Sequence, residues 1–418
     1  MNERKKVLLL TYYFKPCTYV ASNRPNSFAK ELVKNNFDVI VITRHWKGTE
    51  QVWEDYLLRN NSPAIIEKHD HLTIHRLPYQ QTSAVSGGNL FSKFKTLQKL
   101  ILGNINQDVN YYQFKPYIER LLKSESIDLI IASIPPLNAL RLSYELSKKY
   151  GKQLYIDVRD YENNIVLSRN IKPGLVDKIK HRFSLYYSMK WFRAASLIFT
   201  TTPPITKFIS QHSQSNVITI MNGYQERLLN INEKEYDRFH ITLMGSLYEI
   251  PEFNEMLDGF KLLFQKNFGR QIIMQFIGSN TSPSIVSRLK EVIPSPNLVM
   301  RERMAQEKAQ KEAAKSHLLL VLGFKNMKGT LGTKPFEYMG LRKTIIQMPG
   351  DQDLMEKIIL ECHAGYCPRT AEEFVEIVEQ SFYEWKEKGN LEYHGNMGNI
   401  KKYSREEEFK KLLPYLAD

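Results

Sequence analysis

Residues 332–347 read GTKPFEYMGLRKTIIQ, the pattern of a short helix that leads into a strand. A residue before proline favours extended backbone, and proline favours the first turn of a helix. Lys334 therefore lies at the helix start, and Glu337 falls in the first turn. A helix N-terminus attracts anions through its free N–H groups and its dipole, and Lys334 adds charge there. Glu337 is thus either a helix-dipole carboxylate or part of a ligand site.

Short apolar runs alternate with longer amphipathic segments on both sides of this stretch. In the first half we expect strands at 7–11, 39–43, 73–77, 129–133, 154–157, 197–201 and 217–221, and helices at 24–35, 137–150 and 204–212. In the second half we expect strands at 241–244, 272–277, 318–322 and 344–347, and helices at 253–265, 284–292, 305–315 and 371–388. Such alternation predicts parallel sheets with crossover helices, an α/β class.

The chain of 418 residues is too long for one ordinary core. The strand pattern stops in the polar stretch 222–240 and then restarts, which predicts two doubly wound domains. We expect an N-terminal domain at 1–222, a linker at 223–240, a C-terminal domain at 241–395, and a C-terminal helix at 396–418 that packs back on the first domain. Ligands of such sheets bind beyond the carboxyl ends of the strands, so the expected site is a cleft between the domains.

The composition, 42% hydrophobic and 25% charged residues, is typical of a globular protein. Three cysteines make no disulfide framework, which favours a reducing, cytoplasmic compartment. The apolar run near the N-terminus, residues 7–10, is too short for a signal peptide, and no segment reaches a membrane-spanning length. The net charge of +13 indicates a polyanionic partner: nucleic acid, anionic lipid or a phosphorylated ligand.

Two segments combine Lys and Arg with large apolar residues, the composition of helices that lie on anionic membranes. In NLFSKFKTLQKLILGNI, residues 89–105, we expect membrane contact by Phe91, Lys93, Phe94, Lys95 and Lys99. The second segment, IKPGLVDKIKHRFSLYYSMKWFRAAS at 171–196, fits a membrane surface and a core-facing helix equally well. The charge thus favours a membrane surface over nucleic acid, for which no recognised motif is present.

Several segments, in order along the chain, resemble the GT-B-fold glycosyltransferases and within them the large retaining group called family 4. They are residues 5–43, LYIDVRDY (154–161), VITIMNGY (217–224), ITLMGSLYE (241–249), TKPFEYMGLRKTIIQMPGD (333–351) and CHAGYCP (362–368). The resemblance covers nearly the whole chain and is specific for the fold and superfamily. It implies two Rossmann-like domains facing a central cleft.

The resemblance also implies a nucleotide-sugar site in the C-terminal domain, with Glu337 on the donor ribose and Lys334 at the diphosphate. The matching positions around them are Thr333, Gly245, Ser246, Lys328 and Gly329. Two features depart from the family. Gly329 stands where many members carry a second acid, and GSLYE at 245–249 lacks the Arg and Lys that usually hold the diphosphate.

On the acceptor side the matching residues are Asn23, Arg24 and Arg159. Arg24 faces a phosphate or is a solvated arginine at a helix start. Asp160 is a candidate catalytic base, and Lys334 is the second candidate catalytic residue. For Asp160 the alternative is a helix cap or a structural pair with Arg159.

The sequence DQD at 351–353 resembles a metal-binding motif of the other large glycosyltransferase fold. We interpret it instead as a helix start, with Asp353 and Glu356 spaced as a capping box, and expect no metal and no cofactor.

These features predict a glycosyltransferase that moves a sugar from a nucleotide donor, UDP-linked, to a lipid-linked or other saccharide acceptor. We expect it to act in capsule-, exopolysaccharide- or lipopolysaccharide-type synthesis, as a peripheral protein on the cytoplasmic face of the inner membrane. The retaining outcome is implied by the resemblance alone. The alternative is a non-catalytic nucleotide-sugar-binding or scaffold subunit of a polysaccharide synthesis complex, which the two departures would permit.

Overall fold

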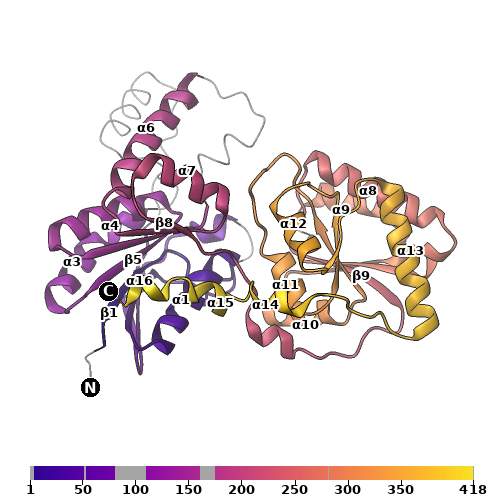
Figure 1. The fold of residues 1–418 in the computed structure, drawn as a ribbon, viewed down its shortest axis with the longest axis horizontal. Coiled ribbons are helices and arrows are strands. Elements are labelled where there is room, and N and C mark those ends of the chain that lie inside the picture. The colour runs from indigo at the N-terminus through magenta and orange to yellow at the C-terminus, as the bar shows by residue number, and fades with distance from the viewer. Residues whose placement is uncertain (1–3, 51–52, 81–109, 161–174, 281, 418) are drawn as a thin grey trace. The chain divides into compact units, whose positions relative to one another are not determined.

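A computed structural model describes residues 4–50, 53–80, 110–160, 175–280 and 282–417. The chain forms two compact units (Figure 1). Unit 1 comprises Met1–Ile220 together with Leu412–Asp418, and unit 2 comprises Met221–Lys411. Each unit is a mainly parallel sheet with crossover helices, which confirms the predicted α/β class and the two Rossmann-like domains.

Unit 1 contains an eight-stranded sheet in the order β3-β4-β2-β1-β5-β6-β7-β8, parallel except for the antiparallel edge pair β3 and β4. Its strands are β1 (Lys6–Leu10), β2 (Asp38–Arg44), β3 (Ile65–His69), β4 (Leu72–Leu77), β5 (Leu129–Ile134), β6 (Gln153–Val158), β7 (Leu197–Thr200) and β8 (Val217–Thr219). Its α-helices are α1 (Asn23–Lys34), α3 (Lys115–Ser124), α4 (Leu137–Tyr150), α6 (Leu175–Phe192), α7 (Pro203–Ser213) and α16 (Leu413–Leu416), and its short 3-10 helices are Val20–Ser22, Trp53–Tyr56 and Tyr111–Phe114.

Unit 2 contains a six-stranded parallel sheet in the order β11-β10-β9-β12-β13-β14. Its strands are β9 (Phe239–Met244), β10 (Ile272–Ile277), β11 (Leu298–Arg301), β12 (Leu318–Leu322), β13 (Thr344–Met348) and β14 (Gly365–Tyr366). Its α-helices are α8 (Pro251–Gln265), α9 (Pro283–Val292), α10 (Gln306–Ala314), α11 (Lys334–Gly340), α12 (Leu354–Glu361), α13 (Ala371–Lys388), α14 (Met397–Lys401) and α15 (Arg405–Lys410), and its 3-10 helices are Glu226–Asn230, Phe268–Gln271 and Ser295–Asn297.

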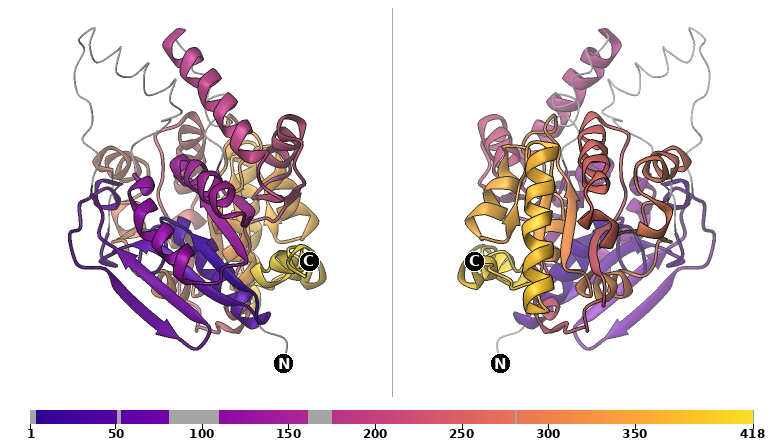
Figure 2. Two further views of the ribbon diagram at one scale, coloured as in Figure 1. Left: turned by 90° about the vertical axis from the view of Figure 1, so that its left-hand side faces the viewer. Right: turned by 90° about the vertical axis from the view of Figure 1, so that its right-hand side faces the viewer.

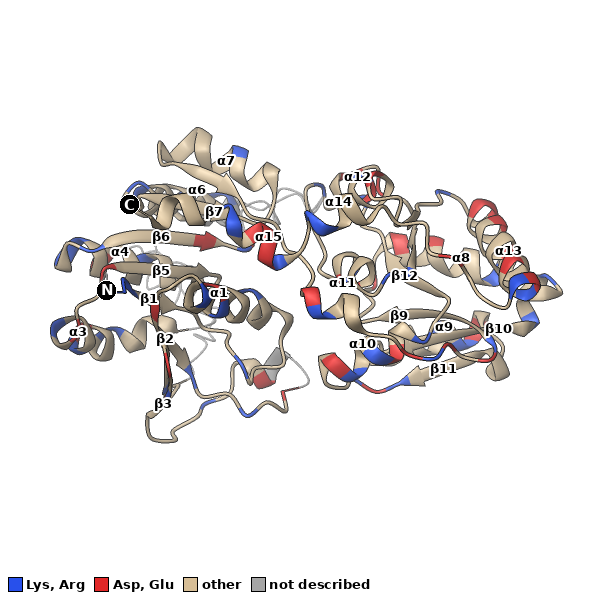
Figure 3. Ribbon diagram, turned by 60° about the horizontal axis from the view of Figure 1, so that its bottom comes forward, with Lys and Arg blue, Asp and Glu red and all other residues tan. Residues whose placement is uncertain are grey.

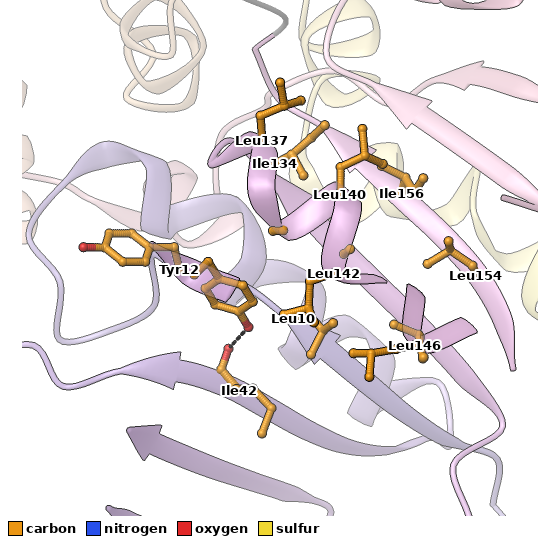
Figure 4. Close-up of a cluster of buried hydrophobic side chains, with 14 of the residues drawn as sticks. Leu10, Tyr12, Ile42, Ile134, Leu137, Leu140, Leu142, Leu146, Leu154 and Ile156 are labelled. Atoms are coloured by element: carbon orange, nitrogen blue, oxygen red, sulfur yellow. Dashed lines mark hydrogen bonds between the residues drawn. The ribbon is translucent and has the colours of Figure 1, made fainter. Parts of the chain in front are cut away.

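The core of unit 1 joins the buried central strands to α4. Leucines along α4, including Leu140, Leu142 and Leu146, pack in one cluster with Leu154 and Ile156 of β6 (Figure 4). All five side chains are fully buried, so the cluster removes a large apolar area from water, at about 25 cal/mol per Å². This core holds the carboxyl ends of β5 and β6 in fixed positions.

The sheet of unit 2 is covered on both faces, as its alternating side chains show. Leu318 and Leu320 of β12 belong to a cluster with α8, α9 and α13, whereas Leu319 between them belongs to a second cluster with α10, α11 and α12. Successive side chains of a strand point to opposite faces. Near-continuous apolar runs are therefore required in these strands, and helices α11 and α12 are fixed against one face of the sheet.

The last residues of the chain return to unit 1. The Nζ of Lys5 donates to the carbonyl oxygen of Leu416 at 3.4 Å, and the hydroxyl of Tyr155 donates to the carbonyl oxygen of Tyr415. Residues 221–240 and 396–411 belong to unit 2. The C-terminal segment forms three short helices, α14, α15 and α16, in place of one.

Candidate functional site

The carboxyl edge of the unit 2 sheet gathers most residues that the sequence singled out for the donor. β9 ends at Met244, and β12 and β13, which run parallel to it, end at Leu322 and Met348. Gly245, the loop 323–333 and residues 349–353 follow these three strands directly. Parallel strands bring their following loops to one edge, which is where ligands of doubly wound sheets bind.

Glu337 lies in the first turn of α11 and is fully buried. Its Oε1 accepts a hydrogen bond from Nε2 of Gln306 at 3.0 Å, and its Oε2 accepts from Nε2 of Gln310 and from Nζ of Lys334, each at 3.2 Å. Burial by itself would raise the pKa of Glu337, but the charges of Lys334 and Arg405 and the hydrogen bonds from Gln310 and Lys334 outweigh it and lower the pKa. The site therefore holds a buried, ionised carboxylate.

Lys334 connects this carboxylate to the loop after β9. A Cβ atom added at Gly245 would lie 3.5 Å from Cε of Lys334, an ordinary van der Waals contact, so the lysine chain passes directly beside this glycine, whose φ is +116°. The backbone N–H of Gly245 donates to the carbonyl oxygen of Ile277 at 2.9 Å. This N–H is therefore already engaged within the protein. Ser246 is exposed, and Thr333 is half-buried.

The loop before α11 is fastened by carboxyl and carbonyl groups from 351–353. Nζ of the exposed Lys328 donates to the carbonyl oxygen of Asp351 at 2.5 Å, and the N–H of Gly329 donates to Oδ2 of Asp353 at 2.5 Å. Gly329 has a φ of +75°, a left-handed conformation that side chains other than glycine adopt at a cost. This conformation accounts for a glycine where the resembling family often carries an acid.

The predicted capping box at 353–356 is wrong, although α12 does begin there. Asp353 precedes the first residue of α12, but its carboxylate makes no side-chain cap and binds Gly329 instead. Glu356 accepts from the N–H of Gln352 at 2.7 Å, one residue before the expected partner. The motif DQD thus fixes the loop of the candidate site.

In unit 1, Arg24 forms a buried ion pair. Its Nε donates to Oδ1 of Asp157 at 2.8 Å, and the hydroxyl of Ser133 donates to Oδ2 of the same aspartate at 2.8 Å. Both charged side chains are less than a tenth exposed. The alternative of a solvated arginine at the helix start is therefore wrong. Asn23, the first residue of α1, is buried beside it.

Arg159 and Asp160 follow β6 at the carboxyl edge of the unit 1 sheet. The buried guanidinium of Arg159 donates to the carbonyl oxygens of Ala21 and Pro135, at 2.6 and 2.5 Å. Asp160 is exposed as a residue, but loss of water around its carboxyl group raises its pKa, and the charge of Asp157 adds to this effect against the opposing charges of Arg159 and Arg24. A raised pKa suits a carboxylate that exchanges a proton with an acceptor.

Some expected residues are not tested by the structure. Phe91, Lys93, Phe94, Lys95 and Lys99 lie outside the described residues. Within the described ranges, no group of three or more His, Cys, Asp or Glu side chains is placed to hold a metal ion. Among the described helices, none combines the length and the apolar character needed to cross a membrane.

Four residues of these sites were missed by sequence reasoning: Gln306, Gln310, Asp157 and Asp353. The two glutamines are four residues apart on α10 and so lie on one face, but nothing local relates that face to Glu337. Asp157 falls inside a predicted strand and resembles any buried polar residue. Only tertiary structure assigns them.

Comparison with known proteins gives structural relatives and no sequence relatives. No protein-family model and no curated protein sequence matches the chain. A glycosyltransferase from Rickettsia africae superposes with a TM-score of 0.60 at 10% identity, covering 99% of this chain and 97% of its own. Anabaena HepE, solved in complex with UDP and glucose, gives 0.61 at 11% identity and covers 99% and 100%. An α,α-trehalose 6-phosphate synthase from Burkholderia multivorans gives 0.62 at 9% identity and covers 99% and 98%.

These similarities extend over the full length of both chains, so they concern the whole two-domain fold. They confirm the predicted GT-B fold class.

Proposed function

We propose that this protein is a glycosyltransferase that uses a UDP-linked sugar donor. The observation that carries the proposal is the buried, ionised Glu337 beside Lys334, at the carboxyl edge of a Rossmann-like unit. The fold is shared with HepE, which has been solved with UDP and with UDP-glucose. A carboxylate that accepts hydroxyl donors next to a cation suits a ribose followed by a diphosphate.

Glu337 takes the ribose by exchanging one hydrogen-bond donor for another. Gln306 is partly exposed, whereas Gln310 is buried. A ribose hydroxyl that replaces the amide of Gln306 at Oε1 conserves the number of hydrogen bonds to the carboxylate, while Gln310 and Lys334 keep Oε2 in place. The exchange therefore costs little beyond moving one surface side chain.

Lys334 stabilises the leaving diphosphate. Its side chain is 29% exposed, and its Cε lies within van der Waals distance of the position that a Cβ on Gly245 would take. A preorganised cation at the point where negative charge develops is the electrostatic part of catalysis. Ser246 and Thr333, both accessible to solvent, add hydroxyl donors at the same edge.

On the acceptor side, Asp160 accepts the proton of the acceptor hydroxyl, and Arg159 and Arg24 hold the surrounding backbone and Asp157 in place. The acceptor is a lipid-linked saccharide in surface polysaccharide synthesis, met at the cytoplasmic face of the inner membrane. Transfer of a hexosyl or related group retains the anomeric configuration and needs no metal. The net charge of +13 supports the membrane location.

The test is a thermal-shift panel of nucleotide sugars on the full chain, followed by donor hydrolysis and transfer assays with and without EDTA. We expect UDP and one UDP-sugar to raise the melting temperature by mass action, and UDP to be released slowly in the absence of acceptor. If no nucleotide sugar stabilises the chain, the proposed donor site is refuted.

A second candidate is a subunit that binds a nucleotide sugar without turning it over. The specific observation in its favour is Gly329, whose conformation leaves no acid in the donor-sugar loop. Such a subunit would show the thermal shift with UDP-sugar but neither hydrolysis nor transfer.

A further inference from the structure

The positive charge of the chain belongs to one unit. Residues 1–220 with 412–418 contain 31 Lys and Arg against 18 Asp and Glu, whereas residues 221–411 contain 27 of each. The net charge of +13 is therefore that of unit 1, and unit 2 is neutral. Charge confined to one unit indicates an anionic partner for that unit rather than a general need for solubility.

Within unit 1 the sequence separates the two signs of charge still further. Residues 178–225 contain six Lys and Arg and no Asp or Glu. This stretch includes most of α6 and all of α7, which pack against each other. In Figure 3 the ribbon of α7 carries basic and no acidic residues. Between Asp177 and Glu226, which border this stretch, the cations have no carboxylate along the chain to neutralise their field.

The exposed side of α6 is a stripe of cations with two apolar side chains inside it. At about 100° per residue, with the helical spacing continued to Arg193 directly after α6, the exposed residues among the described side chains of 178–193 fall within an arc of about 120°. They are Lys178, Ile179, Arg182, Tyr186, Lys190 and Arg193. Ile179 is 42% exposed and Tyr186 63% exposed. We call these six residues the α6 stripe.

The opposite side of α6 anchors the helix in unit 1. Ser184, Ser188, Trp191 and Phe192 are buried, and α6 packs against α4 and α7. Figures 1 and 2 show α6 extending beyond the other described elements of unit 1. The C-terminal half of α6 is thus packed in unit 1, and the two large apolar residues of the stripe are left in water.

We infer that the α6 stripe docks on an anionic lipid bilayer. A nucleic acid would pair with the cations and could stack a base on Tyr186, but it offers no apolar phase for Ile179. A bilayer takes up both Ile179 and Tyr186 at the level of its headgroups while its anionic lipids attract the cations. Each Lys or Arg near an anionic surface strengthens binding about fivefold. The inference rests on the proposed function only for the identity of the membrane, since vesicle binding is measured without any turnover.

The first experiment measures the partition of the full chain onto vesicles with and without phosphatidylserine. We expect binding to anionic vesicles that falls with salt, and a loss of about 30-fold in Arg182→Ala/Lys190→Ala. The matched control is Lys266→Ala/Arg270→Ala, which removes two exposed cations from unit 2. It should leave the partition unchanged. An equal loss in both variants would overturn the inference.

The second experiment reads insertion directly and does not depend on the double variant. Tyr186→Trp places an indole in the α6 stripe, and Tyr383→Trp places one at a 51% exposed position of α13 in unit 2. Lipids brominated near the headgroup should quench the added fluorescence at 186 and not at 383. Equal quenching at both sites, or none at 186, overturns the inference. Tighter binding to an RNA homopolymer than to anionic vesicles at matched salt does so as well.

Discussion

Replacing Glu337 by glutamine tests the donor site with the smallest change in shape. Gln306 and Gln310 both direct N–H donors at this carboxylate, so the amide nitrogen of the new side chain must face one of them. Gln306 can turn toward solvent, but Gln310 is 1% exposed and cannot. A buried donor without an acceptor costs about 1–3 kcal/mol. Lys334 is partly hydrated and adds little. We expect the free energy of unfolding to fall by about 2 kcal/mol.

The same substitution weakens UDP because the ribose loses a charged acceptor. Hydrogen bonds to charged groups contribute about 1.5–3 kcal/mol, so Glu337→Gln should bind UDP roughly 10- to 150-fold more weakly in isothermal titration calorimetry. Glu408→Gln is the matched control. Glu408 is 2% exposed and accepts from the N–H of Met221 and from Nζ of Lys411, each at 2.7 Å. It should lose stability but keep its UDP affinity. Equal UDP affinity in wild type and folded Glu337→Gln would refute the assignment of the ribose to this carboxylate.

Three further substitutions address the exchange, the loop and a buried histidine. Gln306→Ala should bind UDP within threefold of wild type or more tightly by calorimetry, since the ribose no longer displaces an amide; a loss above tenfold would contradict the exchange. Gly329→Ala should lower the unfolding free energy by about 1–2 kcal/mol and raise KM for the donor, because of the φ of +75°; unchanged KM and melting temperature would contradict the loop assignment. Burial lowers the pKa of His317 to about 3. On acidification through about pH 6.5 the histidine is therefore protonated in the unfolded chain but stays neutral in the folded chain. The unfolding free energy of wild type, measured with denaturant, should consequently fall by about 2 kcal/mol from pH 7.5 to pH 5. His317→Phe should lack this loss, and equal pH slopes would contradict the assignment.

Several elements with strong local patterns were predicted, but the amphipathic helix α3, Lys115–Ser124, was not. Leu137–Tyr150 and Ala371–Lys388 were predicted residue for residue, because apolar side chains recur there at helical spacing. Strand β3 was not predicted. It is an edge strand, and its Ile65 and Ile66 are about half exposed, so no alternation of buried and exposed residues marks it.

The candidate site divides in the same way between local and tertiary information. Lys334 and Glu337 were found because a proline and an acid at a helix start form a local pattern. The groups that hold Glu337 come from α10, and no property of residues 306–310 relates them to residue 337. Asp353 was assigned to a cap because its local pattern fits one. The helix start was correct, but a tertiary partner, the N–H of Gly329, competes for the same carboxylate.

The contact between Gly329 and Asp353 is relevant to catalysis, because Gly329 stands where the resembling family often carries an acid. Gly329 turns through a left-handed conformation, its N–H is held by Asp353, and Asn326 in the same loop donates twice to the buried Glu252, at 3.1 Å each. An acid at position 329 would strain this turn, so the absent acid and the fastened loop are one structural feature. A loop fixed by the carboxylates of Asp353 and Glu252 is preorganised, which favours a site that binds a donor in one geometry. Counting acids in the loop therefore cannot separate an enzyme from a binding subunit, and only release of UDP from the donor does so.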